Sequence, residues 1–581
     1  MIAILLVFQN PQNLEEEVLG EAEYEIEVYP KPFVSYPYDP TRDINRILIM
    51  EGKDSLAARI IRLRSNLDLM ADSASIARAI KDLHADENTS AVLMISFLYL
   101  KGYYSTASDM AFTLMNSDIR DIFRSVIYRI YAISSLQAKK YGQVSTTFLP
   151  SIEEGTLNDS LIIWAVAEDI YYRGDYVQSE KLQSRNYNSM DMELSSLALY
   201  GGGWSSLHIG KYSEALGLFR KGEARARRPV VLNLIKIGEA IALFNMGNRQ
   251  EALSIIMSVD EKLIPPESRK ELLYYRGLIA YYNRQDDQAI KDFSEFVQEF
   301  PTDRRAAFVA LKLSDLYRFN GNYKEAIANL EWIVSNFGRI PEKENALYLL
   351  GELYYSQEDY ELALHKYLQL IEEFSSSDYI PAARIRVEQI LTRLATEDEK
   401  YIEVFERYFP DSPKLVDVYY YWGSKYFQEG NLEKAAEYFY KLALKFPNNP
   451  KAPEALFTAG QIYMKLGKYA DAAEVFKRLL NLYPAFSKRG EAYANVGISM
   501  VNEGRVMEAI RYLENALRKE ANRLSEYDKA VIYMYLGLAY EKGGNLQKAR
   551  EYLERARNQF FAIGRVDKLE EVNKYLDALP R

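Results

Sequence analysis

Apolar residues recur every three or four positions along most of the chain, and short turns rich in glycine and asparagine interrupt this pattern. The spacing predicts amphipathic helices, and the regular turns predict that the helices come in pairs. Residues 455–484 show the arrangement most clearly. Six positions stand out there, namely Gly460, Tyr463, Gly467, Ala472, Phe476 and Pro484.

These positions describe two antiparallel helices joined by a tight turn. The glycine at 460 lets the second helix approach the first closely, and Tyr463 fills the space between the two helices. Gly467 predicts a left-handed cap at the end of the first helix, Ala472 is small where the helices cross, and Pro484 ends the second helix. Each unit is therefore predicted to be a helix-turn-helix.

The same unit returns at a spacing of about 37 residues when the small residue of the second helix is used for alignment. A constant spacing predicts a solenoid, in which each unit packs mainly on its neighbours. The first three units and the one at Asp398 are placed by spacing more than by residue type. The aligned residues are Ala107, Val144, Ser179, Ala215, Ala252, Ala289, Ala326, Ala363, Asp398, Ala435, Ala472, Ala509 and Ala549.

This pattern resembles the tetratricopeptide repeat (TPR), which has a small residue, an aromatic, a glycine turn, an alanine, an aromatic and a proline at these relative positions. The resemblance covers about residues 88–570. It implies an all-α, right-handed superhelical solenoid of about 13 helix-turn-helix units, preceded by a short irregular N-terminal segment. Two features depart from the family: its usual length is roughly 34 residues, and its early tryptophan is here mostly Leu, Tyr or Ala.

Several units end in Glu-Phe-Pro, Lys-Phe-Pro or Leu-Tyr-Pro. Together with the longer unit, these endings resemble the TPR subgroup of bacterial cell-envelope proteins. That subgroup includes the lipoprotein that works with the outer-membrane barrel assembly machine and the coordinator of envelope constriction. The resemblance implies a bacterial protein of the periplasm or cell envelope, and the alternative is a cytoplasmic location.

The chain starts with an apolar run at residues 2–8, which is too short to span a bilayer as a helix. One interpretation is the remnant of a secretory signal, although no basic residue precedes the run and the first is Lys31. The other is a helix or strand that caps the first repeat.

The segment that follows is predicted to be extended. Residues 23–29 alternate charged and apolar side chains, which is typical of a short, half-buried strand. A helix is then expected at about residues 54–68. The prolines in between predict an extended linker, and they are Pro30, Pro32, Pro37 and Pro40.

The chain is accordingly divided into four parts. Residues 1–50 form an N-terminal arm, and residues 51–375 form a first TPR stack with additional helices at its start. Residues 376–413 lose the glycines of the repeat, which suits either a degenerate repeat or a joint between two stacks. Residues 414–581 form a second stack that ends in a polar capping helix, because nothing packs beyond the last unit of a solenoid.

Candidate chemistry is scarce. The absence of cysteine excludes thiolate metal sites, disulfides and cysteine nucleophiles. The histidines show no metal-ligand spacing, and they are His84, His208 and His365. The net charge of -10 argues against nucleic acid as the main partner. We therefore expect no catalytic residue, no metal and no cofactor.

Two glycine motifs resemble phosphate loops. Gly210 and Lys211 are followed by Tyr212, which departs from the P-loop motif. Gly203, the last of three successive glycines, falls in the helix-packing position of the repeat. The repeats also leave too few residues for a typical catalytic domain, so the protein is not expected to be an enzyme.

Aromatic side chains recur at the two positions of the first helix that face the concave side of a TPR stack. Such a groove would suit apolar or extended segments of a partner protein, because rigid rings supply contact area at a low entropic cost. The alternative is that the rings pack on neighbouring repeats. The predicted groove residues are Tyr200, Tyr274, Tyr281, Arg318, Tyr348, Tyr355, Tyr420, Phe427 and Phe457.

The sequence thus favours a non-enzymatic scaffold or assembly factor that binds segments of partner proteins, with peripheral membrane association through an envelope complex. Three alternatives stay open. One is a cytoplasmic TPR adaptor. Another is a structural protein that associates with itself and uses the groove for its own N-terminal segment, taken from residues 2–29. The third is an enzyme with an unrecognised N-terminal site.

Overall fold

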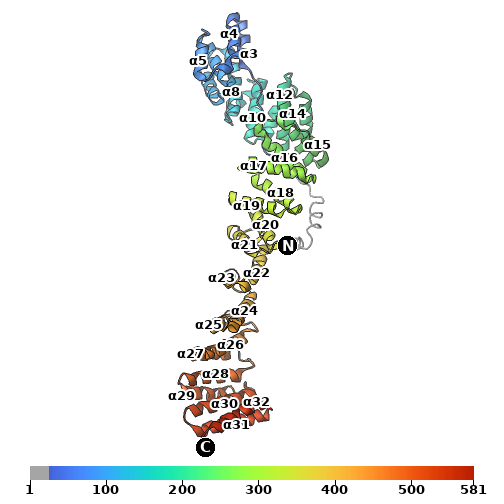
Figure 1. Cartoon of the computed structure of the whole chain (residues 1–581). Helices are drawn as coiled ribbons and strands as arrows, with labels where there is room; N and C mark the ends of the chain where they lie inside the picture. Colours follow the sequence, from blue (N-terminus) through green and yellow to red (C-terminus); the bar gives the residue numbers. More distant parts are fainter. Residues whose placement is uncertain (1–24, 581) are drawn as a thin grey trace. The chain divides into compact units, whose positions relative to one another are not determined.

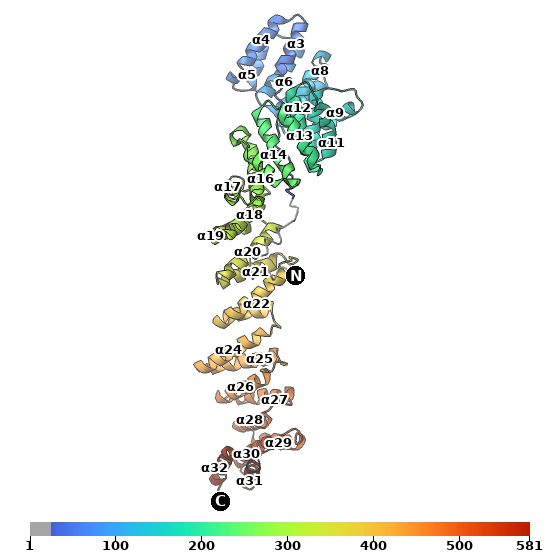
Figure 2. The same cartoon turned by 90° about the vertical axis from the view of Figure 1, so that its right-hand side faces the viewer.

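The computed structural model describes residues 25–580 (Figures 1 and 2), so the apolar run at residues 2–8 lies outside the described part. Every regular element in the described part is a helix. The chain forms two compact units, Met1–Phe337 and Gly338–Arg581. None of the described helices has the length and apolar character needed to cross a bilayer.

The first unit starts with three helices that precede the repeats and continues with helix pairs in chain order. Its helices are α3 Pro40–Met50, α4 Asp54–Ser65, α5 Ser73–Lys81, α6 Glu87–Leu100, α7 Tyr104–Met115, α8 Arg124–Gln137, α9 Gln143–Glu153, α10 Ser160–Tyr172, α11 Tyr176–Gln183, α12 Met192–His208, α13 Tyr212–Arg225, α14 Pro229–Asn245, α15 Arg249–Met257, α16 Arg269–Tyr282, α17 Asp286–Glu299, α18 Ala306–Phe319 and α19 Tyr323–Asn336.

The second unit consists of helix pairs and one final helix. Its helices are α20 Pro341–Ser356, α21 Tyr360–Glu373, α22 Ile380–Glu397, α23 Lys400–Tyr408, α24 Lys414–Glu429, α25 Leu432–Lys445, α26 Ala452–Lys465, α27 Tyr469–Leu482, α28 Arg489–Asn502, α29 Val506–Lys519, α30 Glu526–Lys542, α31 Leu546–Ala562 and α32 Val566–Ala578. The helices pack in consecutive pairs from α6 and α7 to α30 and α31, which confirms the predicted solenoid of helix pairs.

The aligned small residues lie where the paired helices cross. Twelve of the aligned positions have no exposed surface, for example Ala107, Ser179 and Ala472. Asp398 is the exception, because it is the C-cap residue of α22 and its side chain is exposed. In that unit the spacing therefore points to a turn residue, and the buried residues of α23 are Ile402 and Phe405.

Glycines of the first helices make room for rings of the second helices. A Cβ atom added to Gly460 would lie 2.7 Å from the Phe476 ring, so the ring rests directly on the backbone of α26. Gly351 and Tyr367 repeat the arrangement at 2.5 Å. Gly467 has a φ of +72°, as expected for the left-handed residue that ends the first helix.

The N-terminal arm differs from the prediction in two ways. Residues 25–29 form no strand, because their backbone groups bond to side chains and not to another strand. A helix, α3, begins within the predicted arm at Pro40, where Asp39 accepts a hydrogen bond from the backbone of Thr41. Proline at the first helical position promotes a helix start, so the last proline of the predicted linker was misread.

Residues 376–413, the predicted joint or degenerate repeat, lie inside the second unit, where α22 and α23 form a helix pair. The two compact units divide earlier in the chain, after Phe337. At the other end, α32 covers the last helix pair at the position predicted for the capping helix.

Candidate peptide-binding groove

A segment of the chain itself, residues 25–38, lies along the first helices of successive pairs in the first unit. It has no regular secondary structure. Its N-terminal part contacts α14 and α16, its middle contacts α10 and α12, and Tyr38 meets Tyr99 of α6. The segment therefore runs along the repeats in the direction opposite to chain order.

Side chains of the repeats bind the backbone of this segment. Asn245 uses both amide atoms on Ile26, accepting from its N–H at 2.8 Å and donating to its carbonyl at 3.1 Å. Further along, four tyrosine hydroxyls and one arginine also bind the backbone of the segment. The Tyr275 hydroxyl accepts from the N–H of Tyr29, and the Tyr171 hydroxyl accepts from the N–H of Lys31. Three side chains donate to carbonyls: Tyr172 to Lys31, Tyr200 to Pro32 and Arg228 to Ser35. A strand in a sheet receives its bonds from a neighbouring backbone, whereas here side chains supply them.

Lys31 is the most deeply held side chain of the segment. The residue is only 3% exposed, and its ammonium pairs with the carboxylate of Glu168, which is 2% exposed. The same ammonium lies 4.6, 5.1 and 5.3 Å from the ring centroids of Tyr171, Tyr172 and Tyr200. Burial lowers the pKa of Lys31, and the charge of Glu168 opposes that effect. The arrangement is a cation site made of one carboxylate and three aromatic faces.

Gly201 creates the space for this cation site. The second carboxylate oxygen of Glu168 accepts a hydrogen bond of 2.8 Å from the amide of Gln183. A Cβ atom at Gly201 would lie 2.6 Å from the Gln183 nitrogen and 2.8 Å from that carboxylate oxygen. Gly203 packs on Phe219, as the repeat pattern predicts, so the three successive glycines serve helix packing and the polar site together.

Rings and apolar side chains hold the rest of the segment. Tyr29 meets Tyr274 edge to face at 5.3 Å, and the guanidinium groups of Arg304 and Arg305 lie 4.4 and 4.9 Å from the Tyr29 ring. Ile26 is 3% exposed. The segment thus buries apolar, aromatic and charged side chains in one continuous groove.

His208 borders the cation site. Its Nε2 lies 2.9 Å from the Tyr171 hydroxyl, and its ring stacks on Tyr176 at 4.0 Å. Burial, together with the nearby charge of Lys31, lowers the pKa of His208 to about 4. Burial also shifts a carboxyl group, since it raises the pKa of Glu271 on α16 to about 7. Both groups therefore titrate differently in the folded and the unfolded chain.

Acid is expected to weaken the first unit through His208. A histidine whose pKa is lowered on folding stabilises the fold above about pH 6.5, and this contribution is lost as the pH falls toward 4. Over the same pH interval, the raised pKa of Glu271 changes the free energy of unfolding in the opposite direction. The test therefore compares the loss in the parent with the loss in His208→Phe, because Glu271 is present in both. From about pH 7 to about pH 4.5 we expect the parent to lose about 2 kcal/mol more unfolding free energy than His208→Phe.

Denaturant unfolding of the first unit at both pH values measures this difference. His365→Phe is the matched control, because His365 is exposed and lies in the second unit. It should follow the parent at both pH values. Equal losses in the parent and in His208→Phe would show that the buried imidazole does not resist protonation.

The structure places the four predicted groove residues of the first unit differently. Tyr200 and Tyr274 contact residues 25–38 directly. Tyr281 is half-buried, with the ammonium of Lys312 at 5.2 Å from its ring. Arg318 pairs with Asp315 of its own helix at 3.0 Å. Two of the four predicted residues, Tyr200 and Tyr274, thus contact the segment, whereas the contacts described for Tyr281 and Arg318 are with other side chains of the repeats.

Several residues that hold the segment escaped the sequence analysis. Glu168, Tyr171 and Tyr172 belong to a unit that is placed by spacing more than by residue type, and Asn245 stands at the end of its helix. One signal was available, since tyrosine doublets at 171–172 and 274–275 both face the segment. In the first doublet both hydroxyls bind the backbone of the segment, and in the second doublet one residue supplies its hydroxyl and the other its ring.

The predicted groove residues of the second unit differ in exposure. Tyr348 and Phe457 are buried, at 6% and 2% exposure. Tyr348 stacks on Tyr379, whereas Phe457 meets Phe476 edge to face. Tyr355 lies under the guanidinium of Arg386 at 4.5 Å. Tyr420 and Phe427 on α24 are 42% and 45% exposed. These last two rings therefore have surface that a partner can contact, although Tyr420 also meets Phe439 edge to face at 5.7 Å.

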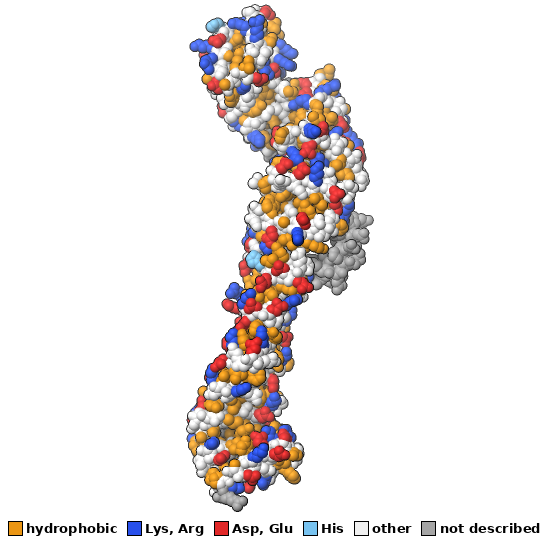
Figure 3. All heavy atoms as spheres, viewed as in Figure 1, with side chains coloured by type: hydrophobic (Ala, Val, Ile, Leu, Met, Phe, Trp, Pro, Cys, Tyr) orange, Lys and Arg blue, Asp and Glu red, His pale blue; other side chains and the backbone are white. Residues whose placement is uncertain are grey.

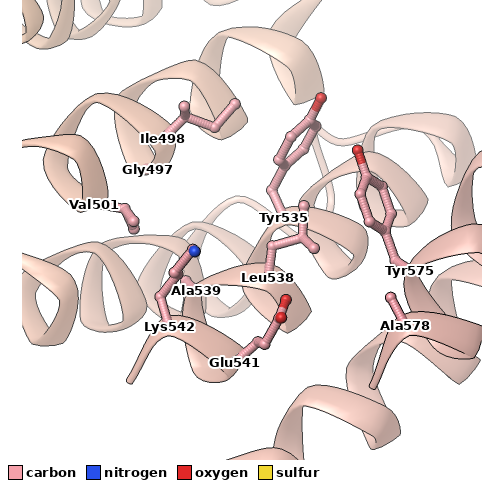
Figure 4. Close-up of a pocket in the computed structure, with 10 residues that line it drawn as sticks. All are labelled: Gly497, Ile498, Val501, Tyr535, Leu538, Ala539, Glu541, Lys542, Tyr575 and Ala578. Carbon is pink, nitrogen blue, oxygen red and sulfur yellow. The ribbon is translucent and has the colours of Figure 1, made fainter. Parts of the chain in front are cut away.

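The second unit also has a hollow near its C-terminal end, between α28, α30 and α32. Its volume is about 410 Å³, and it is lined mainly by apolar groups such as Ile498, Val501 and Leu538 (Figure 4). The rings of Tyr535 and Tyr575 stand at one side of it, and hydrophobic side chains gather over α28 on the surface shown in Figure 3. Among residues 25–580, no cluster of three or more acidic or histidine side chains is arranged to hold a metal ion.

Three family models described as tetratricopeptide repeat match the chain. One matches residues 311–378 and 497–561, another matches residues 453–486, and the third matches residues 271–303 and 417–449. The matches coincide with helix pairs of both units. The chain is therefore a tetratricopeptide repeat protein, and repeats of this family indicate a scaffold for protein–protein interactions.

A search of curated protein sequences gives no match. Among solved structures, the chain is similar to the pilF protein of Pseudomonas aeruginosa (17% identity, 40% of this chain, 97% of that one, TM-score 0.31). It is also similar to the C-terminal part of a TPR protein of Cytophaga hutchinsonii (18%, 44% and 99%, TM-score 0.29) and to the P58(IPK) TPR domain (16%, 70% and 99%, TM-score 0.19). The family assignment rests on the repeat matches.

Proposed function

We propose that this protein is a non-enzymatic scaffold that binds segments of other proteins along the first helices of its repeats. The observation that carries the proposal is the groove of the first unit, where side chains bind the backbone of an irregular segment at five successive places. Binding through backbone groups gives affinity for extended chains, and pockets for side chains add specificity. The exposed rings of α24 offer a comparable surface in the second unit.

The cellular setting that we propose is a bacterial cell-envelope complex in the periplasm, with membrane association only through that complex. The support is the repeat length of about 37 residues and the Phe-Pro or Tyr-Pro endings of the units. A cytoplasmic adaptor is the alternative setting. Fractionation of native cells, followed with an antibody against the protein, distinguishes the two.

Removing the exposed rings of α24 is expected to weaken partner binding without unfolding the protein. The double variant Tyr420→Ala/Phe427→Ala should lose about 1–3 kcal/mol of binding free energy for each ring. The melting temperature should change little, because both side chains are more than a third exposed. The partner is recovered from native cells with the parent chain, purified, and titrated against both proteins by calorimetry.

A matched control uses two exposed leucines on second helices of the same unit. Leu444 and Leu482 are 40% and 45% exposed, so Leu444→Ala/Leu482→Ala removes a similar kind of surface elsewhere. This control should bind as the parent does. A folded Tyr420→Ala/Phe427→Ala protein with parental affinity would contradict the assignment of α24 as a binding surface.

A further inference from the structure

We propose that the groove of the first unit is a binding site for an extended segment of a partner protein that carries a lysine between two prolines, with aromatic residues on both sides. Residues 25–38 are its resident ligand, which such a segment displaces. The inference rests on the proposed function, since it treats the groove as a surface for peptides. It adds the chemical class of the ligand and the way in which access is controlled.

The resident segment is held as a bound peptide is held. The hydrogen bonds that join its backbone to the repeats all use side chains of the repeats, in the described part of the chain. Such bonds form equally well with any chain that has the same backbone path. Pro30 and Pro32 flank the central lysine and restrict the backbone, which lowers the entropic cost of binding.

The cation site gives the groove its selectivity. Without an ammonium group, the carboxylate of Glu168 would stay buried with only the amide of Gln183 as a partner. The faces of Tyr171, Tyr172 and Tyr200 attract a cation. A ring face has no donor, so it cannot give the carboxylate a hydrogen bond when the cation is absent. A segment that places an uncharged residue at this position is therefore rejected.

The aromatic residues of the segment define the rest of the ligand. Tyr29 lies two positions before Lys31 and meets Tyr274, and Phe33 lies two positions after and meets Tyr172 at 6.2 Å. The expected ligand thus reads aromatic, proline, lysine, proline, aromatic. The order is set by the spacing of the rings on α16, α10 and α12.

Displacement is needed because the resident segment is tethered. It is followed directly by α3, which begins at Pro40, so its effective concentration at the groove is on the order of millimolar. A weak or mismatched peptide cannot compete with it. A partner segment with the aromatic, proline, lysine, proline, aromatic order can displace it when a larger complex presents that segment.

The test uses a fluorescent peptide with the sequence of residues 25–38 and the full-length chain, followed by anisotropy. In the Lys31→Met chain the resident ligand lacks its ammonium, so the peptide should bind at least about tenfold more tightly than to the parent. The same peptide with methionine in place of its lysine should bind this chain at least about tenfold more weakly. Lys211→Met, which alters an exposed lysine beside Glu214, should match the parent.

Equal peptide affinity for the Lys31→Met chain and the parent would overturn the proposal, and so would equal affinity of the lysine and methionine peptides. Dimers of the parent that depend on Lys31, detected by sedimentation, would show that a second copy of the chain is the occupant and would overturn the assignment to another protein. These outcomes leave the test of Tyr420 and Phe427 untouched, because those residues lie in the second unit.

A second measurement needs no variant and therefore does not depend on how well Lys31→Met folds. Excess unlabelled peptide is added to the parent, and amide hydrogen exchange is followed along the chain. Displacement should increase exchange at residues 26–35 at least about tenfold, while α10 and α12 keep their protection. Unchanged exchange of the segment at millimolar peptide would show that residues 25–38 are a permanent part of the fold.

Discussion

Ala472→Asp is expected to lower the free energy of unfolding of the second unit by at least about 3 kcal/mol. Ala472 has no exposed surface and lies on α27 where this helix crosses α26. A buried aspartate there either stays charged without a partner or takes up a proton. Both states are costly, because the carboxyl group loses its hydrogen bonds to water. Chemical denaturation of the variant and the parent measures the difference.

Hydrogen exchange should show that this damage is local. Contacts in a repeat array are mostly between neighbours, so protection should fall first in α24 to α29, while helices of the first unit stay protected. Ala470→Asp is the matched control, because Ala470 is exposed on the same helix, two residues earlier. Uniform loss of protection along the whole chain would contradict the modular behaviour that we expect.

The second large effect is expected from Asp292→Ala in the first unit, at about 3 kcal/mol of unfolding free energy. Asp292 of α17 has no exposed surface and accepts three hydrogen bonds from Arg276 of α16, at 3.1, 2.9 and 2.6 Å. Removing the carboxylate leaves the guanidinium of Arg276 buried, with Glu261 at 3.3 Å as its remaining ion-pair partner. A buried guanidinium that loses its closest carboxylate is more costly than one with both partners.

Calorimetry or denaturant unfolding of the parent and the variant measures this loss. Asp287→Ala is the control, because Asp287 is exposed in the first turn of the same helix and should contribute no more than about 0.5 kcal/mol. Since α16 also carries Tyr274 and Tyr275, hydrogen exchange at Tyr29 should rise in Asp292→Ala and stay parental in the control. Similar stability of the two variants would contradict this account of the pair.

The local features of the fold could be predicted because they are encoded within one unit. The contact of Gly460 with Phe476, the left-handed Gly467 and the buried Ala472 all arise between residues that lie close together in the sequence and repeat at a constant spacing. The same physical constraint recurs in each unit, so the pattern is visible even where single residues deviate. Asp398 shows the limit, because spacing without a small residue pointed to a helix cap.

The groove could be predicted only in part. Tyr200 and Tyr274 stand at the positions of the first helices that face residues 25–38, and both belong to the predicted groove. The predicted set also contains Tyr348 and Phe457 together with Tyr420 and Phe427, although the first pair is buried and the second pair is exposed. Which ring faces solvent depends on the rings of the next repeat, and that packing leaves no periodic trace in the sequence.

The sequence by itself determined the helix pairs, their register and the absence of thiol chemistry, because periodicity and composition act locally. Only the tertiary structure decided that Lys31 meets Glu168, 137 positions away, and that Ile26 meets Asn245, 219 positions away. Neither segment carries a regular pattern that points to the other. Their contact depends on how successive first helices line up across several repeats, so that a segment outside the repeats can lie along all of them.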